Sequence, residues 1–459
     1  MTSRRILIRD AVVVTMDDAL GDFSRGSVLV EGERIVAIGV DLAADDAEII
    51  DGAGFIVIPG LINAHMHTWQ TALRGAAANW TLLEYFRWVH AGLATRFRPD
   101  DIHIATLAGA LNQINCGTTT LVDWCHNNPT PAHTDAAVAG LQEAGIRAAF
   151  FHGSPKPEPL PGKPHFSEMP HPRAEIERLL AGPFVQSDGK LSLGLAILGP
   201  HYSTLEVALQ DFRLSRELGL IASMHQGGGP AKAPEGWDVL EAEGLVGPLV
   251  NIVHGNDLPD DRLQRFIDLG VSFSVAPEGE MIQGHGHPIT GRLRAFGAAP
   301  SLGVDLESVV SGYMPTVARA ALSHQRALDN AASRVATGAI PNTSTIKLRE
   351  ALAWITIEGA RMLGMADRIG SLTQGKQADL VLIRADDFDL FPVHDPIATV
   401  IMQSHPGSVD SVMIGGRWHK RHGRLIDADL APIRHDLAAS GTRILAELGW
   451  PGRERELTT

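Results

Sequence analysis

The stretch from Val57 to His67 constrains the fold of this chain more than any other. It reads VIPGLINAHMH: an apolar run turns at Pro59–Gly60, resumes, and ends on His65 and His67. Because alternate side chains of a strand point to the same face, the two imidazoles project together from the carboxyl end of a buried strand. Two neutral imidazoles on one rigid edge form half of a site for zinc or iron. The chain has 20 histidines, so the pair is significant only if suitable partners follow.

Length and charge exclude several classes of protein. With 459 residues the chain exceeds the usual size of one simple core, and we expect one large domain and one smaller domain. Its net charge of −14 argues against nucleic acid or an anionic membrane as a partner. No stretch reaches the ~18–20 apolar residues of a membrane span, and the N-terminus lacks the apolar run of a signal peptide. We therefore expect a cytoplasmic protein in which Cys116 and Cys125 are buried free thiols.

The two ends of the chain share a β-rich pattern that the middle lacks. Strand-like runs fill much of residues 5–39, with a hairpin turn at Gly32, and similar runs return after Ala378. These two regions flank a long middle of different character. We predict one small β-sandwich domain that is assembled from residues 1–57 and 367–430.

The middle of the chain, residues 58–366, alternates short apolar runs with helical stretches. This alternation predicts parallel βα units closed into a distorted (β/α)8 TIM barrel, followed by a C-terminal helical tail over residues 431–459. Residues 154–190 interrupt the rhythm, with seven prolines between Pro155 and Pro172. Such an insertion is expected to form a loop that acts as a lid or a subunit contact. The eight expected strands span residues 58–65, 118–123, 148–151, 191–198, 220–225, 249–254, 271–275 and 300–305.

Partners for the histidine pair lie at the ends of three later strands. His225 ends the fifth expected strand, His254 ends the sixth, and Asp305 ends the eighth. The carboxyl ends of the strands in a parallel barrel meet at one mouth, where catalytic groups lie. The side chains of His65 and His67 and of these three residues therefore point into one cavity. The pattern predicts a metal site there.

These motifs resemble the amidohydrolase superfamily over nearly the whole chain. The sequence is most similar to the branch that holds cytosine and guanine deaminases, S-adenosylhomocysteine deaminase and atrazine chlorohydrolase. The resemblance implies a metal-dependent hydrolase with a small-molecule substrate, and a homo-oligomer, either a dimer or a tetramer. The motifs that carry it are residues 59–67, Leu73-Arg74-Gly75, residues 117–120, Gly199-Pro200-His201, His225, His254, and residues 301–305, 370–372 and 375–381.

The resemblance implies a role for each polar residue at the barrel mouth. His65, His67, His225 and Asp305 would bind one divalent metal per chain, for which we expect zinc, with iron(II) as the alternative. The metal would lower the pKa of a bound water toward ~7. Asp305 would take the proton of that water, and His254 would hydrogen-bond the water or the substrate. Binuclear relatives bridge their metals with a lysine on the fourth strand, and residues 191–200 contain no lysine.

The chain departs from this branch directly after His225. Deaminases of the branch carry His-x-x-Glu, whose glutamate protonates the ring nitrogen of the substrate, whereas Gly228 stands here. A run of three glycines, residues 227–229, leaves space and backbone amides for a bulkier substrate or an anionic group. We predict that Glu280, or failing that Glu278, supplies the missing acid from the end of the seventh strand. A solvated loop carboxylate is the alternative.

Other candidates for substrate contact are less specific. His201 matches a position that contacts substrate in relatives, and a capping role is its alternative. Further candidates lie beside the histidine pair, beside His225 or after the second strand: Trp69, Gln70, Arg74, Gln226, Trp124 and His126. Four aromatic residues at near-helical spacing are more typical of a core or an interface: Trp80, Tyr85, Phe86 and Trp88.

Three functions are compatible with the sequence. The first is a mononuclear metal-dependent amidohydrolase that cleaves a carbon–nitrogen bond, other than a peptide bond, and releases ammonia or an amine from a nitrogen heterocycle. The second keeps the fold and the metal but displaces another group, such as chloride or a thiolate, or opens a cyclic amide. The third is a non-catalytic assembly module, which only the missing glutamate suggests. The presence of all four expected ligands argues against the third, and we favour the first.

Overall fold

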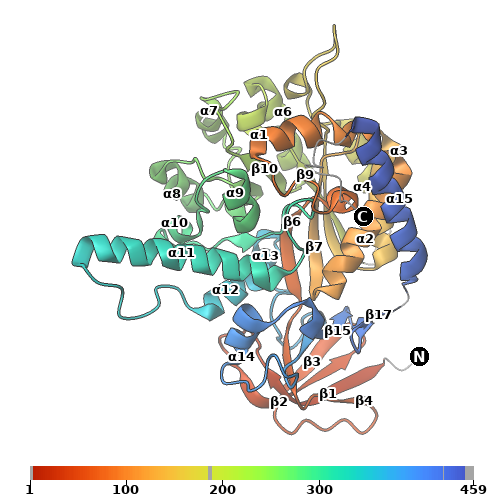
Figure 1. Cartoon of the computed structure of the whole chain (residues 1–459), viewed down its shortest axis with the longest axis vertical. Coiled ribbons are helices and arrows are strands. Elements are labelled where there is room, and N and C mark those ends of the chain that lie inside the picture. Colours follow the sequence, from red (N-terminus) through yellow and green to blue (C-terminus); the bar gives the residue numbers. More distant parts are fainter. Residues whose placement is uncertain (1–3, 185–188, 427, 450–459) are drawn as a thin grey trace, which may run out of the picture.

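Eight parallel strands form the barrel at the centre of the molecule (Figure 1). The computed structural model describes residues 4–184, 189–426 and 428–449. Strands that are neighbours in the barrel are also neighbours in the chain, from β6 to β13, as repeated βα units require. The predicted fold class is confirmed. The strands are β6 (Leu61–Met66), β7 (Thr118–Cys125), β8 (Arg147–Gly153), β9 (Leu191–Ala196), β10 (Ala222–Gln226), β11 (Val250–His254), β12 (Ser272–Val275) and β13 (Ser301–Leu302).

The first and last strands of the barrel meet at two of the predicted metal ligands. β13 is shorter than expected. The residues that follow β13 nevertheless hydrogen-bond to β6 and to the residue just after β6. The Asp305 amide donates to the carbonyl of His65, and the His67 amide donates to the carbonyl of Asp305, each at 2.9 Å. Gly303 permits this approach, because a Cβ there would lie 2.5 Å from the carbonyl oxygen of His65. The closure of the barrel and the position of Asp305 therefore depend on the same contacts.

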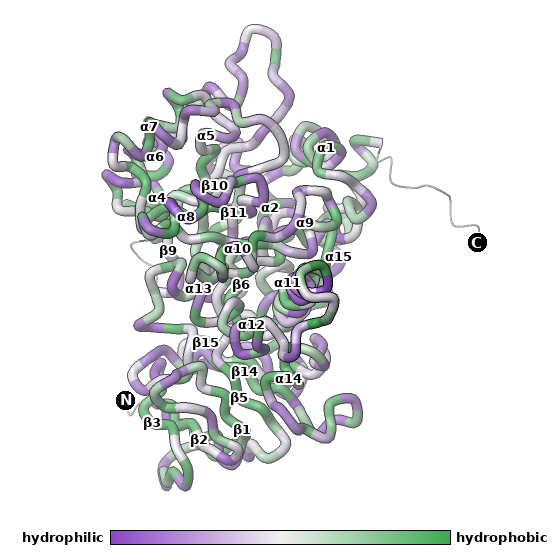
Figure 2. Tube along the Cα trace, turned by 90° about the vertical axis from the view of Figure 1, so that its left-hand side faces the viewer, coloured by the Kyte–Doolittle hydropathy of each residue, from purple (hydrophilic) through white to green (hydrophobic). Residues whose placement is uncertain are grey.

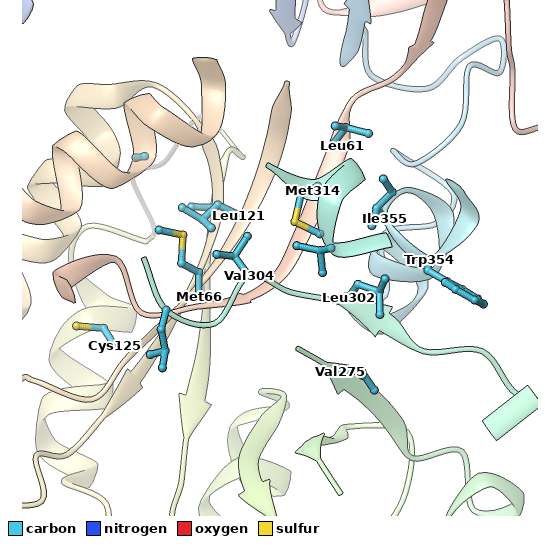
Figure 3. Close-up of a cluster of buried hydrophobic side chains, with 14 of the residues drawn as sticks. Leu61, Met66, Leu121, Cys125, Val275, Leu302, Val304, Met314, Trp354 and Ile355 are labelled. Carbon is cyan, nitrogen blue, oxygen red and sulfur yellow. The ribbon is translucent and has the colours of Figure 1, made fainter. Parts of the chain in front are cut away.

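A large apolar core lies between the barrel and the helices around it. Leu121 and Val275 from the barrel and Met314 and Trp354 from two helices belong to one cluster of buried side chains (Figure 3). Burial of such side chains is the main force that holds the helices on the barrel. The helices are α1 (Leu82–Tyr85), α2 (Pro99–Asn115), α3 (Pro131–Ala144), α4 (Arg173–Ala181), α5 (Gly199–Tyr202), α6 (Leu205–Leu218), α7 (Gly236–Ala242), α8 (Asp260–Asp268), α9 (Pro277–Gln283), α10 (Thr290–Ala295), α11 (Met314–Thr337), α12 (Leu348–Trp354), α13 (Ile357–Met362), α14 (Pro396–Ala398) and α15 (Leu430–Leu448).

The two ends of the chain build a second, mixed sheet of nine strands, which lies below the barrel in Figure 1. Its order is β17-β16-β15-β14-β5-β1-β2-β3, and β4 pairs with β1 beside β5. Figure 2 shows the hydrophobic runs of β1, β5 and β14 together in this part of the molecule. The strands are β1 (Arg5–Val13), β2 (Phe23–Glu31), β3 (Arg34–Gly39), β4 (Glu48–Asp51), β5 (Phe55–Pro59), β14 (Leu380–Arg384), β15 (Val409–Ile414), β16 (Arg417–Arg421) and β17 (Arg424–Leu425).

Gly60 separates the two sheets. The expected first barrel strand, residues 58–65, is split at this glycine: Ile58 and Pro59 pair with β14, and the barrel strand starts at Leu61. Gly60 has no room for a side chain, because a Cβ would lie 2.0 Å from Oγ1 of Thr119. The strand prediction was wrong at this end, since one apolar run serves two different sheets.

A buried ion pair joins the barrel to the terminal sheet. Arg147, at the start of β8, donates from Nε to Oδ2 of Asp379 at 2.8 Å, and each side chain is 3% exposed. The other oxygen of Asp379 accepts from the Gly415 amide at 2.7 Å. Residues far apart in the sequence are thus fixed to one another at the junction.

Several smaller features complete the molecule. The inserted segment after β8 contains a short 3-10 helix, Phe166–Glu168, and α4. Helix α15 occupies the predicted C-terminal tail, of which residues 450–459 lie outside the described residues. Cys116 and Cys125 are buried and unpaired, as predicted. Within the described ranges, none of the helices combines the length and apolar character needed to cross a bilayer.

Candidate metal centre and substrate cavity

Four histidines and one aspartate meet at the carboxyl ends of the barrel strands. His65 lies in β6, His67 follows that strand, His225 lies in β10 and His254 ends β11. Asp305 lies just beyond β13, where it pairs with β6. The ligand atoms of His65, His225, His254 and Asp305 are all within 4.8 Å of one another. The structure thus brings together the five residues that the strand-end pattern selected.

The spacing of these side chains matches the ligand set of one divalent metal. Asp305 Oδ1 lies 3.2 Å from Nε2 of His65 and 3.3 Å from Nε2 of His67. Nε2 of His225 lies 3.3 Å from Nε2 of His65. Two ligands bound to one zinc ion at ~2.1 Å stand about 3.4 Å apart in a tetrahedron. Lone pairs that converge at this spacing repel one another without a cation between them, so the residues present fit a metal.

A hydrogen bond to the backbone fixes the orientation of the His67 ring. Its Nδ1 lies 2.5 Å from the carbonyl oxygen of Trp124. A carbonyl only accepts, so Nδ1 carries the proton and donates, which leaves the lone pair of Nε2 facing Asp305. The ring also stacks on His126, with centroids 4.1 Å apart and planes inclined by 15°. His67 is therefore held in the tautomer that a metal ligand needs.

Burial keeps His65 and His225 neutral, whereas the neighbouring imidazoles keep Asp305 charged. Burial lowers the pKa of His65 to about 4, although the hydrogen bond to Asp305 opposes this. Burial likewise places the pKa of His225 well below its usual value. For Asp305, burial would raise the pKa, but the neighbouring imidazoles, first that of His65, outweigh it and hold the pKa well below the ordinary range. Neutral imidazoles beside an ionised carboxylate are the forms that bind a metal.

His254 differs from the other histidines because it has a carboxylate partner of its own. Its Nδ1 donates to Oε1 of Glu280 at 3.1 Å, and its Nε2 lies 3.9 Å from Oδ2 of Asp305. Burial would lower the pKa of His254, but the hydrogen bond to Glu280 and the charge of Asp305 raise it. Burial would raise the pKa of Glu280, but its hydrogen bonds, first that from His254, lower it. The two side chains form an ion pair at the edge of the metal centre.

Two residues of the centre have a strained backbone. His254 and Asp305 adopt φ angles of +69° and +66°, a left-handed region that side chains other than glycine rarely enter. Each such residue costs ~1–3 kcal/mol and persists only where its surroundings hold it. For Asp305 that support comes from the two hydrogen bonds that close the barrel. Strain of this kind clusters at functional sites.

A small cavity opens beside the metal centre. It is narrow, since the volume open to the centre of a water molecule is only about 30 Å³. Among the described residues its walls combine imidazoles, aromatic rings, two aliphatic side chains, one amide, one ammonium and one carboxylate. They are His67, Leu82, Tyr85, Phe86, His90, His126, Lys156, Tyr202, His225, His254, Gln283, His285, Asp305 and Leu306.

Of the seven candidates for substrate contact, His126 lines the cavity, whereas His201, Trp69, Gln70, Arg74, Gln226 and Trp124 do not. Gln70 donates to the hydroxyl of Tyr85 at 2.6 Å. Trp69 donates to Nδ1 of His126 at 3.0 Å. Three others form contacts farther out: Gln226 with His201 at 3.0 Å, and Arg74 with Glu307 at 2.8 Å. Their direct contact with a substrate stays a prediction, while the structure shows that Gln70 and Trp69 hold residues of the wall in place.

Sequence reasoning missed several residues of the wall. Tyr85 and Phe86 were expected in a core or an interface, and their helical spacing gave no sign of the cavity. Tyr202 follows the predicted His201, so its position next to that motif was the available signal. Lys156 lies in the proline-rich insertion directly after β8, and a lysine so close to the end of a barrel strand was the signal for it.

The structure around the glycine run after His225 leaves little room for a side chain at position 228. Gly228 has a φ of +91°, and a Cβ there would lie 2.6 Å from Cδ2 of Leu82. The hydroxyl of Tyr202 donates to the carbonyl of Gly227 at 2.5 Å and closes the same space. No acidic side chain fits at position 228 without displacing both neighbours. Glu280 has full internal hydrogen bonding and does not line the cavity, so its predicted effect on a substrate would pass through His254.

Comparison with known proteins agrees with this geometry. The sequence model of the amidohydrolase family matches residues 56–419. An 8-oxoguanine deaminase from Pseudomonas aeruginosa is 30% identical, over 95% of this chain and 98% of that protein. A 5-methylthioadenosine/S-adenosylhomocysteine deaminase from Symbiobacterium thermophilum is 28% identical, over 90% and 93% of the two chains. The crystal structure of atrazine chlorohydrolase TrzN from Arthrobacter aurescens TC1 with zinc aligns with a TM-score of 0.83 at 24% identity, over 95% of this chain and 100% of that one. The chain therefore belongs to the amidohydrolase family.

Proposed function

We propose that this hydrolase binds one divalent metal and releases ammonia or an amine from a nitrogen heterocycle. The observation that supports this best is the 3.2–3.3 Å spacing of ring nitrogens and carboxylate oxygen at the barrel mouth. The two deaminases named above match nearly the whole chain, which supports extending the proposal from the metal to the reaction.

His65, His67, His225 and Asp305 would hold the metal, with zinc as the first choice and iron(II) as the alternative. His254 also lies within reach of the group, but its Nε2 is 3.9 Å from Asp305, farther than the ~3.4 Å expected between two ligands of one ion. A bound divalent ion would activate a water molecule for attack on the substrate. The test below counts the metal directly.

Two side chains are placed to move protons during that attack. Oδ1 of Asp305 faces His65 and His67, whereas its Oδ2 faces His254. Oδ2 would accept the proton of the attacking water, and Nε2 of His254 would donate a hydrogen bond to the substrate beside it. Glu280 holds His254 in that orientation. We therefore keep Glu280 in the proposed machinery as a positioning residue that acts through His254.

One observation favours a second reaction, displacement of a leaving group other than an amine. Among the described residues that line the cavity, Asp305 is the only carboxylate, and position 228 carries glycine. An amine departs only with an added proton, whereas chloride or a thiolate can depart as an anion. A missing acid therefore suits such leaving groups, or the opening of a cyclic amide. The complete ligand set disfavours a non-catalytic assembly module.

Ammonia release would test the proposal. The purified protein is incubated with aminated purines, pyrimidines, pterins and triazines, with Asp305→Asn as the blank, and its metal content is measured. We expect one metal per chain and ammonia from at least one compound, absent with the variant. Loss of a compound without release of ammonia or an amine would favour the second reaction instead. Two metals per chain would overturn the mononuclear site, and a metal-free protein without turnover would overturn the enzyme itself. The homo-oligomer and the cytoplasmic location stay predictions.

A further inference from the structure

A buried lysine lies in the wall of the substrate cavity and has no part in the chemistry proposed so far. Lys156 stands between Pro155 and Pro157, three residues after the end of β8. It is 8% exposed, and it lines the same cavity as His225 and Asp305. The inserted segment thus delivers a positive charge to the metal centre.

The ammonium of Lys156 has aromatic neighbours but no acceptor. It lies 4.9 Å from the ring centroid of Tyr202 and 5.9 Å from that of Trp124. Across the described ranges, the chain offers it neither a hydrogen bond nor an ion pair. Burial lowers its pKa from 10.5 to about 8. The side chain is 8% exposed, so few water molecules can solvate the ammonium, and cation–π contacts offset only part of that loss of hydration. An acceptor supplied by a ligand would satisfy the ammonium.

The glycine run explains how the lysine comes to occupy this position. A side chain at position 228 would meet Leu82 and the hydroxyl of Tyr202, the latter at 3.2 Å from an added Cβ. Tyr202 is tied to the carbonyl of Gly227, and its ring is the one nearest to the ammonium of Lys156. Because position 228 carries no side chain, there is room for Tyr202, whose ring contacts the ammonium of Lys156. Position 228 therefore carries no acidic side chain, and Lys156 contributes a positive charge to the cavity wall.

The polar groups of the cavity wall also indicate what they would bind. An ammonium has three donors and no acceptor. Gln283 lines the same cavity at 3% exposure, and its Nε2 donor has no partner among the described residues. A glutamate would recognise a ring N–H, whereas unpartnered donors recognise an oxygen. The charge and hydrogen-bonding character of the pocket are thus those of a site for an oxygen-bearing ring.

We propose that Lys156 is a specificity-determining residue that binds an oxo or carboxylate oxygen on the heterocyclic substrate. The inference rests on the proposed function in that it takes the substrate to be a heterocycle at this cavity. The oxygen would accept a charged hydrogen bond from Nζ of Lys156 while the reacting carbon faces the metal centre. Rings that carry such an oxygen would be selected over rings that lack it.

Binding of rings without a leaving group would test this independently of turnover. Purine, hypoxanthine and purine-6-carboxylate share one skeleton and differ in the oxygen they carry, and none has an amino group to lose. Their dissociation constants are measured by calorimetry on the metal-loaded wild type and on Lys156→Met, Lys156→Gln and Lys163→Met. Lys163 is an exposed lysine of the same insertion and serves as the matched control.

We expect the wild type to prefer at least one oxygen-bearing ring over purine by ~10–100-fold, the usual effect of one charged hydrogen bond. Lys156→Met should abolish that preference, Lys156→Gln should retain part of it, and Lys163→Met should retain all of it. Preference for hypoxanthine would identify an oxo group, and preference for purine-6-carboxylate a carboxylate. A wild type without preference, or a preference that survives in both Lys156 variants, overturns the inference. If the preference depends on Lys156 but no compound is hydrolysed, only the proposed reaction fails.

Discussion

Glu280 illustrates how a side chain can influence the metal centre without facing the cavity. Oε1 accepts from the Ala276 amide at 2.7 Å and from His254 at 3.1 Å, and Oε2 accepts from Asn256 at 3.0 Å. A carboxylate bonded in this way has no freedom to turn toward a substrate. Its negative charge instead keeps His254 oriented and raises the pKa of that imidazole beside Asp305.

Glu280→Gln should therefore lower kcat by ~10²-fold or more, because an amide cannot stabilise the positive charge on His254. The change is nearly isosteric, so KM and the melting temperature should stay close to those of the wild type. Steady-state kinetics and calorimetry would measure both. Glu278→Gln, at the neighbouring carboxylate that does not bond His254, is the control. If the variant kept the kcat of the wild type, the pairing of Glu280 with His254 would not contribute to catalysis.

Residues differ in how far the sequence reveals them. His65, His225 and Asp305 could be predicted to converge because each lies at or just beyond the end of a strand, and the topology of a barrel brings those ends together. Lys156 could not be placed in the same way. It lies in a proline-rich insertion whose path depends on tertiary contacts, above all the ring of Tyr202. Local sequence patterns do not reveal such contacts.

Among the elements, β6 and the short β13 are the pair on which the barrel depends. The hydrogen bonds that join them lie just beyond β13, where Asp305 pairs with β6 and the Val304 amide donates to Oδ1 of Asn63, and Gly303 allows the two chains to approach. A Cβ at Gly303 would overlap the carbonyl oxygen and the Cβ of His65, at 2.5 Å and 2.7 Å. The neighbouring strands would have to separate to accept it.

Gly303→Ala should lower the free energy of unfolding by ~1–3 kcal/mol, as overpacking usually does. It should also weaken metal binding by ~10–100-fold, since the substitution shifts the support of two ligands. Thermal denaturation and metal competition with a chelator would measure the two effects. Gly247→Ala is the matched control, because its Cβ would make only an ordinary contact at 3.8 Å. Unchanged metal affinity in Gly303→Ala would contradict the link between closure and ligation.

The strand pattern predicted the barrel well, and its failures have physical causes. The residues on both sides of Gly60, from Val57 to Ile62, carry no polar side chain, so hydropathy does not reveal that the run is divided between two sheets. The expected strand that ends at Asp305 is mostly irregular, because the left-handed backbone at Asp305 interrupts regular pairing. Hydropathy indicates that a strand is buried, which is true in both sheets. It does not identify the strand with which it pairs.

At the scale of the whole molecule, the pair formed by Arg147 and Asp379 couples the barrel to the terminal sheet. Both side chains are buried, and no solvent can compensate a charge left alone there. Ion pairs at the surface are different. Arg173 and Glu217, for example, are 46% and 58% exposed and remain hydrated when separated.

Asp379→Ala should therefore lower the free energy of unfolding by ~3–5 kcal/mol, the usual effect of removing one partner of a buried ion pair. Glu217→Ala should change it by less than ~1 kcal/mol. Equilibrium denaturation of both variants beside the wild type would measure the difference. Equal stability of the two variants would show that the junction does not depend on this pair.

The nine-stranded sheet has a consequence for the order in which the protein is made. β5 belongs to the first part of the chain, yet its neighbour β14 comes from near the end. At ~5–20 residues per second, the ribosome exposes the edge of β5 for roughly 15–60 s before β14 emerges. Ile56, Val57 and Ile58 are buried in the finished protein but stay open to other strands during that interval. The N-terminal strands are thus the part of the nascent chain that depends most on chaperone protection and on complete translation.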